Sequence, residues 1–110
     1  MPDSQAPSRA QVEWAIGGIL RKIANATVRP RVGLRELVTV YRDAPKADSR
    51  QFVGEEYGIA ELIGYFYGYD DLEERPAEVS FDGRYGAKAV ESLDAEVVRL
   101  AKAWLCARDA

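Results

Sequence analysis

The sequence predicts an all-α domain, a compact bundle of about four helices with one small β-hairpin near residues 78–85. A length of 110 residues suits one domain and is too short for two independent cores. Hydrophobic residues make up 47% of the chain and charged residues 30%, which is an ordinary globular composition. Apolar residues recur at helical spacing in segments joined by short connections, and this pattern favours a helical bundle.

Residues 1–7 are polar and hold two prolines, so we expect a disordered tail before a single domain over residues 8–110. The first helix is expected to begin at Ser8, because its hydroxyl can cap the first turn and Gln11 completes a capping box. Its apolar stripe comprises Val12, Ile16, Ile19, Leu20 and Ile23. Trp14 falls on the opposite side, where burial in a second layer is the preferred interpretation and a dimer contact is the alternative.

A break and a short second helix are predicted next. The break covers residues 25–33, because Pro30 disfavours helix in the residue before it and Gly33 loosens the backbone. The second helix ends at the turn-forming residues 43–49. Its shared face comprises Leu34, Leu37, Val38 and Tyr41.

The third helix is expected to begin at Ser49 or Glu55 and to end at Tyr67. Its apolar arc comprises Ile59, Leu62, Ile63 and Phe66. The chain then leaves helical conformation through residues 68–76, which end in a proline.

Residues 78–85 alternate around Asp82 and Gly83, a pair that suits a tight hairpin turn. The last helix is expected from about Ser92 to about Arg108, because Ser92 can cap it and two acidic residues follow near the positive end of the helix dipole. Its buried stripe comprises Leu93, Val97, Leu100, Ala101 and Trp104.

The composition excludes most catalytic chemistry. The chain contains no histidine, and Cys106 is its only cysteine. Nucleophile pairs that use histidine cannot be assembled, and zinc and most transition-metal sites lack their ligands. The acidic residues 70–74 lack the spacing and the turn glycine of a calcium loop. We therefore expect no enzymatic activity, no catalytic residue, no metal and no cofactor.

The chain has no stretch that approaches the roughly 18 consecutive apolar residues of a membrane span. Its N-terminus lacks the basic and apolar regions of a secretory signal. A single cysteine agrees with a reducing compartment. We therefore expect a cytoplasmic protein with no membrane partner.

Charge is distributed unevenly along the sequence. Residues 43–82 hold 11 acidic and 3 basic side chains, a net charge of −8, whereas residues 1–42 hold 7 basic and 3 acidic side chains, a net charge of +4. This asymmetry can steer a basic partner toward the acidic segment. The two segments can equally pair with each other inside the domain, and both interpretations stay open.

Residues 57–71 combine tyrosines, glycines and carboxylates. Tyr65 lies opposite the apolar arc, next to a shallow notch formed by Gly64 and Gly68. Tyrosine is enriched at the centres of interfaces, although a neighbouring helix of the same chain could also fill the notch. The candidate partner-binding residues are Glu55, Glu56, Glu61, Tyr65, Tyr67, Tyr69, Asp70, Asp71, Glu73 and Glu74.

Residues 34–41, 58–71 and 94–105 resemble, in helix order and in acidic and aromatic composition, the small helical immunity proteins that bacteria make against bacteriocins and contact-delivered toxins. The resemblance implies a cytoplasmic inhibitor that docks on a basic toxin, often a nucleic-acid-cleaving one. Its carboxylates would take the place of phosphates in the active site of the toxin. The resemblance transfers no individual binding residue.

Two other functions stay open. A homo-oligomeric helical domain with a structural or regulatory role would use Trp14, the glycines beside it, or the notch. A nucleic-acid binder would use the basic residues between 21 and 35. A pI near 5.0 and the lack of interleaved aromatic residues argue against nucleic acid as a partner.

Overall fold

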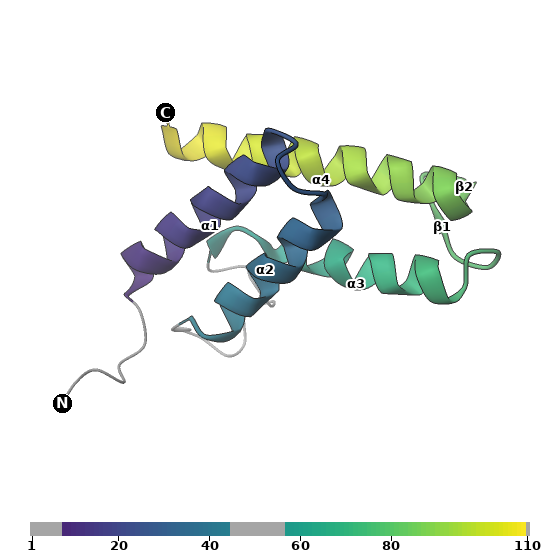
Figure 1. Ribbon diagram of the computed structural model, residues 1–110, viewed down its shortest axis with the longest axis horizontal. Coiled ribbons are helices and arrows are strands. Elements are labelled where there is room, and N and C mark those ends of the chain that lie inside the picture. Colours follow the sequence, from purple (N-terminus) through teal and green to yellow (C-terminus); the bar gives the residue numbers. More distant parts are fainter. Residues whose placement is uncertain (1–7, 45–56, 110) are drawn as a thin grey trace.

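The computed structural model describes residues 8–44 and 57–109, so the predicted tail at residues 1–7 lies outside the described residues. Its elements are α1 (Arg9–Ala24), α2 (Pro30–Arg42), α3 (Ala60–Glu74), β1 (Ser80–Phe81), β2 (Arg84–Tyr85) and α4 (Gly86–Asp109) (Figure 1). The predicted all-α class with one small hairpin is confirmed. Within the two described ranges, every helix is too short or too polar to pass through a bilayer.

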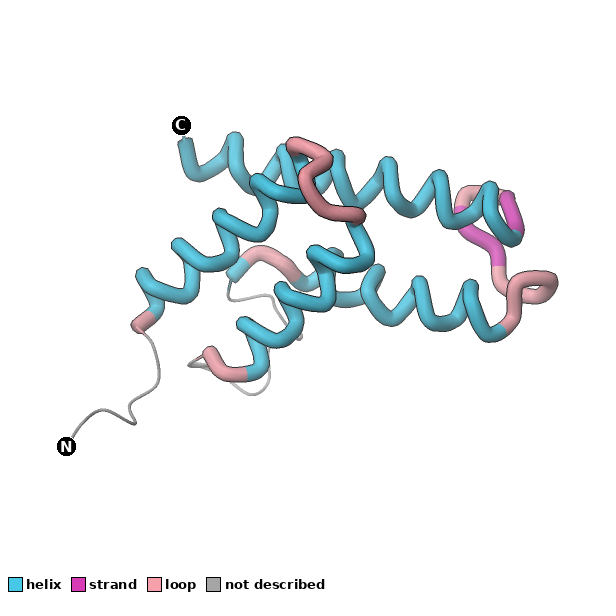
Figure 2. Tube along the Cα trace, in the orientation of Figure 1, coloured by secondary structure: helices cyan, strands magenta, loops and turns pink. Residues whose placement is uncertain are grey.

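The helices pack in two pairs. α3 and α4 run antiparallel along the long axis, and the hairpin joins them at one end (Figures 1 and 2). α1 packs on α2 and α4, and α3 also packs on α2 and α4. All four helices contribute buried side chains to one hydrophobic cluster, so the described residues form a continuous core.

α1 begins where the sequence predicts. The Ser8 hydroxyl accepts a hydrogen bond from the Gln11 amide at 3.1 Å, and the Gln11 side chain accepts one from the Ser8 amide at 2.8 Å. All residues of the predicted apolar stripe are buried. The expectation that Trp14 is buried in a second layer is wrong, because its side chain is 80% exposed. A second layer would need another packed element on that side of α1, and the described elements pack on the opposite side.

α2 begins at Pro30, inside the segment where the sequence predicts a break. Proline suits this first helical position because its missing N–H has no helical partner there. Gly33 lies within the helix and faces α1, where an added Cβ would lie 2.4 Å from Ile23 Cγ1. Gly33 therefore allows close approach of the two helices instead of ending one. The predicted face is buried: Leu34, Leu37, Val38 and Tyr41.

α3 begins at Ala60 and ends at Glu74, so the predicted end at Tyr67 is seven residues too early. The predicted starts, Ser49 and Glu55, lie outside the described residues, and residues 57–59 are not α-helical. The helix continues because Tyr69 and Leu72, each 3% exposed, extend its buried stripe. This packing outweighs the low helix propensity of glycine. Phe66 is only half-buried.

The hairpin forms where it is predicted. Asp82 and Gly83 have φ values of 55° and 72°, and β1 pairs antiparallel with β2. α4 follows at once from Gly86, whose φ of 61° turns the strand directly into the helix. The predicted start at Ser92 is therefore wrong, and the acidic residues after it lie away from the end of the helix. The buried stripe of α4 is confirmed except for Leu100, which is half-buried.

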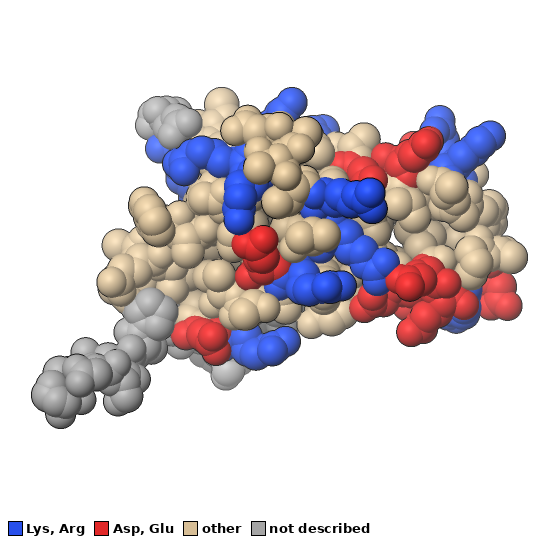
Figure 3. Space-filling model, viewed as in Figure 1, with Lys and Arg blue, Asp and Glu red and all other residues tan. Residues whose placement is uncertain are grey.

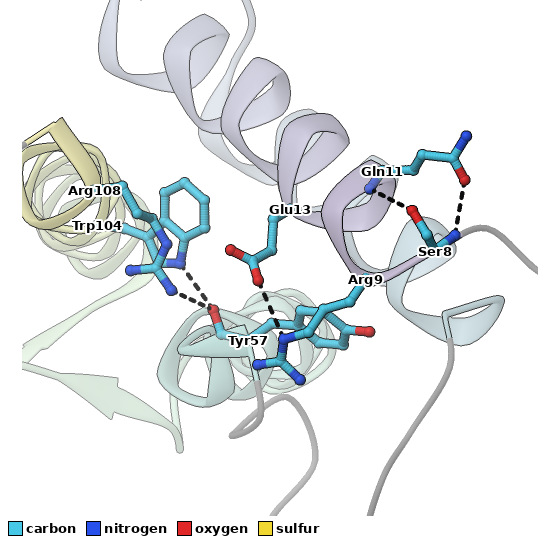
Figure 4. A network of polar contacts seen from close by, with 7 residues as sticks. All are labelled: Ser8, Arg9, Gln11, Glu13, Tyr57, Trp104 and Arg108. Atoms are coloured by element: carbon cyan, nitrogen blue, oxygen red, sulfur yellow. Dashed lines mark hydrogen bonds and ion pairs between the residues drawn. The ribbon is translucent and has the colours of Figure 1, made fainter.

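The turn before α3 is tied to both α1 and α4 (Figure 4). The carbonyl oxygen of Tyr57 accepts hydrogen bonds from Trp104 Nε1 at 2.9 Å and from Arg108 Nη2 at 3.3 Å. The Arg9 guanidinium lies 4.9 Å from the centroid of the Tyr57 ring, and the Tyr41 ring meets that ring edge-on at 6.2 Å. These contacts fix the place from which α3 starts.

Candidate protein-interaction surface

The solvent-facing side of α3 carries an exposed tyrosine followed by two carboxylates. Gly64, Tyr67, Asp71 and Glu74 succeed one another at intervals of three or four residues, so they share one side of the helix, which we name the outer face of α3. All four are exposed, and the Tyr67 side chain is 55% exposed. Figure 3 shows acidic side chains gathered over the C-terminal end of α3.

Two carboxylates of the acidic segment bind an arginine of α2 instead of facing solvent freely. Arg31 Nη2 lies 2.8 Å from Asp70 Oδ1, and Arg31 Nη1 lies 2.5 Å from Glu73 Oε2. The hydrogen bond to Glu73 is the main cause that raises the pKa of Arg31, and burial opposes it. Pairing between the basic and acidic halves of the sequence therefore applies to Asp70 and Glu73, and it leaves Asp71 and Glu74 directed outward.

Tyr69 lies in the core, away from the predicted binding surface. Its side chain is 3% exposed, and its hydroxyl donates a hydrogen bond of 2.5 Å to Asp94 Oδ1 on α4. Burial raises the pKa of Tyr69 well above its usual value, and the hydrogen bond to Asp94 adds to the increase. Its position follows from the extension of α3 past Tyr67, which carries the buried stripe through Tyr69.

Tyr65 and Glu61 lie on the flank of α3 that faces the hairpin and α4. Tyr65 is half-buried, and its ring meets the Phe81 ring edge-on at 5.7 Å between centroids. Burial raises the pKa of Tyr65, and the charges of Glu96 and Glu61 raise it further. Glu61 is exposed at the edge of this flank. Tyr65 is therefore partly covered by another element, whereas the Tyr67 ring meets the Phe66 ring of its own helix edge-on at 5.3 Å and stays 55% exposed.

The two glycines of the predicted notch have different surroundings, because Gly68 faces the domain and Gly64 faces solvent. A Cβ added at Gly68 would lie 4.0 Å from Leu93 on α4, whereas one added at Gly64 would meet no atom within 4 Å. The neighbouring helix therefore fills the Gly68 side, and only Gly64 opens to solvent. Glu55 and Glu56, also predicted to bind a partner, lie outside the described residues.

A second exposed surface lies on α1, where the sequence favours burial of Trp14 and leaves a dimer contact as the alternative. Trp14 stands opposite the buried stripe, with Gly18 beside it and no atom within 4 Å of a Cβ added at Gly18. A shallow groove of about 210 Å³ runs from Trp14 to Leu105 and Arg108 on α4. The sequence does indicate this exposed surface, since Trp14 falls on the polar side of the helical wheel.

A cleft of about 500 Å³ lies where α2, α3 and α4 meet. Its lining is Arg29, Arg31, Tyr69, Glu73, Val90 and Asp94. Four of these side chains already bind one another, since Arg31 pairs with Glu73 and Tyr69 donates to Asp94. Within residues 8–44 and 57–109, no three His, Cys, Asp or Glu side chains are grouped as metal ligands.

No family model matches this chain, and neither a curated protein nor a solved structure is significantly similar to it. The function must therefore be inferred from the surfaces themselves. The strongest feature of these surfaces is the outer face of α3, where an exposed aromatic ring adjoins outward carboxylates on a rigid helix.

Proposed function

We propose that this protein is a binding protein whose outer face of α3 docks on a basic surface of another protein and inhibits it. The observation that carries the proposal is the exposure of Tyr67 on the same helical side as Asp71 and Glu74. Tyrosine supplies contact area and a polar tip at low entropic cost, and outward carboxylates attract a basic partner.

The outward carboxylates are available to a partner. Asp71 lies 3.9 Å from Arg75, and both side chains are more than half exposed. Such a surface pair contributes about 0–1 kcal/mol, so a cation of a partner can replace Arg75 at little cost. Among the described residues, Glu74 has no ion-pair partner.

Arg31 prepares this surface without belonging to it. It binds Asp70 and Glu73 at successive turns of α3 and thereby holds the C-terminal half of that helix against α2. A helix fixed before binding loses less conformational entropy when it docks. Asp70 and Glu73 therefore position the outer face, whereas Tyr67, Asp71 and Glu74 make the contacts.

The class of partner follows from the resemblance to immunity proteins. A basic, nucleic-acid-cleaving toxin presents a surface that binds phosphates, and carboxylates on a helix can occupy the same cations. The proposal is therefore an immunity-type inhibitor of a basic toxin. A toxin gene beside the gene of this protein supports this class, and its absence counts against it.

Charge reversal tests the surface. Asp71→Lys with Glu74→Lys should weaken binding of the toxin that the adjacent gene encodes by about 10-fold or more. The main cause should be slower association that depends less on salt. Tyr67→Ala should mainly speed dissociation. Asp70 stays unchanged in this test because Arg31 holds it.

The matched control reverses two exposed carboxylates elsewhere, Asp43→Lys with Glu91→Lys, and produces the same net charge. Surface plasmon resonance at several salt concentrations measures both rate constants. Equal losses in the two double variants would show that only net charge matters, and they would contradict a docking site on α3.

A further inference from the structure

We name the side of α1 that carries Ala10, Trp14, Gly18 and Arg21 the outer face of α1. It presents a protruding tryptophan beside an open depression at Gly18. Trp14 is 80% exposed, and a Cβ added at Gly18, one turn further along, would meet no atom within 4 Å. Ala10 is exposed one turn before Trp14, and Arg21 is exposed two turns after it. A tryptophan this exposed on a rigid helix is the typical anchor of a protein interface.

We propose that this face binds the same face of a second copy. The two α1 helices run antiparallel, and the two-fold axis passes between them at the height of Gly17 along the helix. Two-fold interfaces are self-complementary, so the same patch must carry both a projection and the hollow that receives it. The outer face of α1 meets this condition. An axis at the height of Gly17 pairs position 14 with position 20 of the second copy, so each Trp14 ring lies between that copy's Gly18 and its Arg21 guanidinium.

Charge complementarity supports the second copy as the occupant. Glu13 and Arg21 line the same groove as Trp14 and lie on either side of Gly17, four residues before it and four after it. The antiparallel arrangement therefore brings Glu13 opposite the second copy's Arg21, and this pair occurs twice. Glu13 also contacts Arg9 of its own helix at 3.2 Å. This pair is exposed and weak, so Glu13 can leave Arg9 and bind Arg21 of the second copy.

The small area of the interface sets the expected affinity of the dimer. α1 has 16 residues and is therefore about 24 Å long. Its outer face, widened by Leu105 and Arg108 of α4 along the groove, is smaller than the roughly 800 Å² that each partner buries in a standard interface. We expect a reversible dimer with a dissociation constant of about 10 µM. The dimer does not depend on the proposed inhibitor function, because the outer faces of α1 and α3 share no residue.

Sedimentation equilibrium of the full chain over a range of concentrations tests the dimer. Trp14→Ala should raise the dissociation constant about 30-fold or more, as expected for an anchoring tryptophan. Gly18→Leu should also abolish the dimer, because it fills the depression, and circular dichroism should show an intact monomer. Tyr67→Ala, which removes an exposed ring on α3, should leave the dimer unchanged.

The charge pair tests the antiparallel arrangement. Glu13→Arg and Arg21→Glu should each weaken the dimer, and the double variant should restore it because the pair is then reversed in both places. Failure of the double variant to restore dimerisation would overturn this arrangement. A wild-type protein that stays monomeric at several hundred micromolar, or a Trp14 shielded from iodide in the monomer, would overturn the proposal itself.

Discussion

Trp104 Nε1 on α4 donates a hydrogen bond of 2.9 Å to the backbone carbonyl oxygen of Tyr57, which lies 47 residues earlier in the chain. This bond joins the last helix to the turn from which α3 starts. The Arg108 guanidinium completes the arrangement, because it lies 3.9 Å from the centroid of the Trp104 ring and donates to the same oxygen. Two side chains from the C-terminal turns of α4 thus bind the same backbone carbonyl oxygen.

Trp104→Phe should destabilise the protein by about 1–2 kcal/mol, because the buried carbonyl of Tyr57 loses its shorter hydrogen bond. Urea unfolding followed by circular dichroism measures the change. The matched control is Trp14→Phe, which alters an exposed ring and should stay within about 0.5 kcal/mol of the wild type. Equal effects of the two substitutions would contradict a structural role for the bond.

Arg31→Ala should destabilise the protein by about 1 kcal/mol, since it leaves Asp70 and Glu73 without their cation on a partly exposed surface. The loss should shrink at high salt, because screening already weakens the pairs in the wild type. Arg29→Ala is the control, because Arg29 has no ion pair among the described residues. Thermal unfolding at low and high salt distinguishes the two variants. A loss of stability in Arg31→Ala that is the same at both salt concentrations would argue against an electrostatic cause.

Stability should fall at alkaline pH through Tyr69. Burial, reinforced by the hydrogen bond to Asp94, raises the pKa of this hydroxyl in the folded state above its unfolded value of about 10. The stabilisation is therefore fully present below pH of about 10 and is lost as the pH rises further, when only the unfolded chain releases the proton. Tyr69→Phe should flatten this alkaline loss in urea titrations at pH 7 to 11. Tyr85→Phe, at an exposed ring, should leave the loss unchanged.

Two helical glycines should respond in opposite directions to alanine. Gly33→Ala should destabilise the protein by about 1–3 kcal/mol, because the new methyl group would overlap Ile23 between α1 and α2. Gly18→Ala should stabilise it by up to about 1 kcal/mol, because the space there is open and alanine is the better helix former. Differential scanning calorimetry of both variants checks the signs. A stabilising Gly33→Ala would show that the two helices separate easily.

The predictions that depend on neighbouring residues in the sequence agree best with the structure. The capping box of Ser8 and Gln11 and the hairpin turn at Asp82 and Gly83 each depend on a few adjacent residues, and both form as predicted. The start of α4 is different. It depends on a positive φ at Gly86, and the plausible cap at Ser92 conceals it.

The parts of the candidate surface that sequence could not place depend on tertiary contacts. Tyr69 is buried because α3 extends past its glycine to pack on α4, and helix propensity alone does not predict that extension. Asp70 faces Arg31 only because α2 crosses α3 at that turn. Trp14 is exposed because the described elements leave the outer side of α1 uncovered, a property of the whole packing.

The tip of the hairpin offers a point of attachment that leaves the outer face of α1 clear. An atom added at Gly83 would meet nothing within 4 Å, and the tip lies at the end of the molecule opposite α1 and the C-terminal end of α4 (Figure 1). α4, with 24 residues, separates the two ends by about 36 Å. A short peptide tag inserted between Asp82 and Gly83 should therefore tether the protein to a sensor surface with a known orientation.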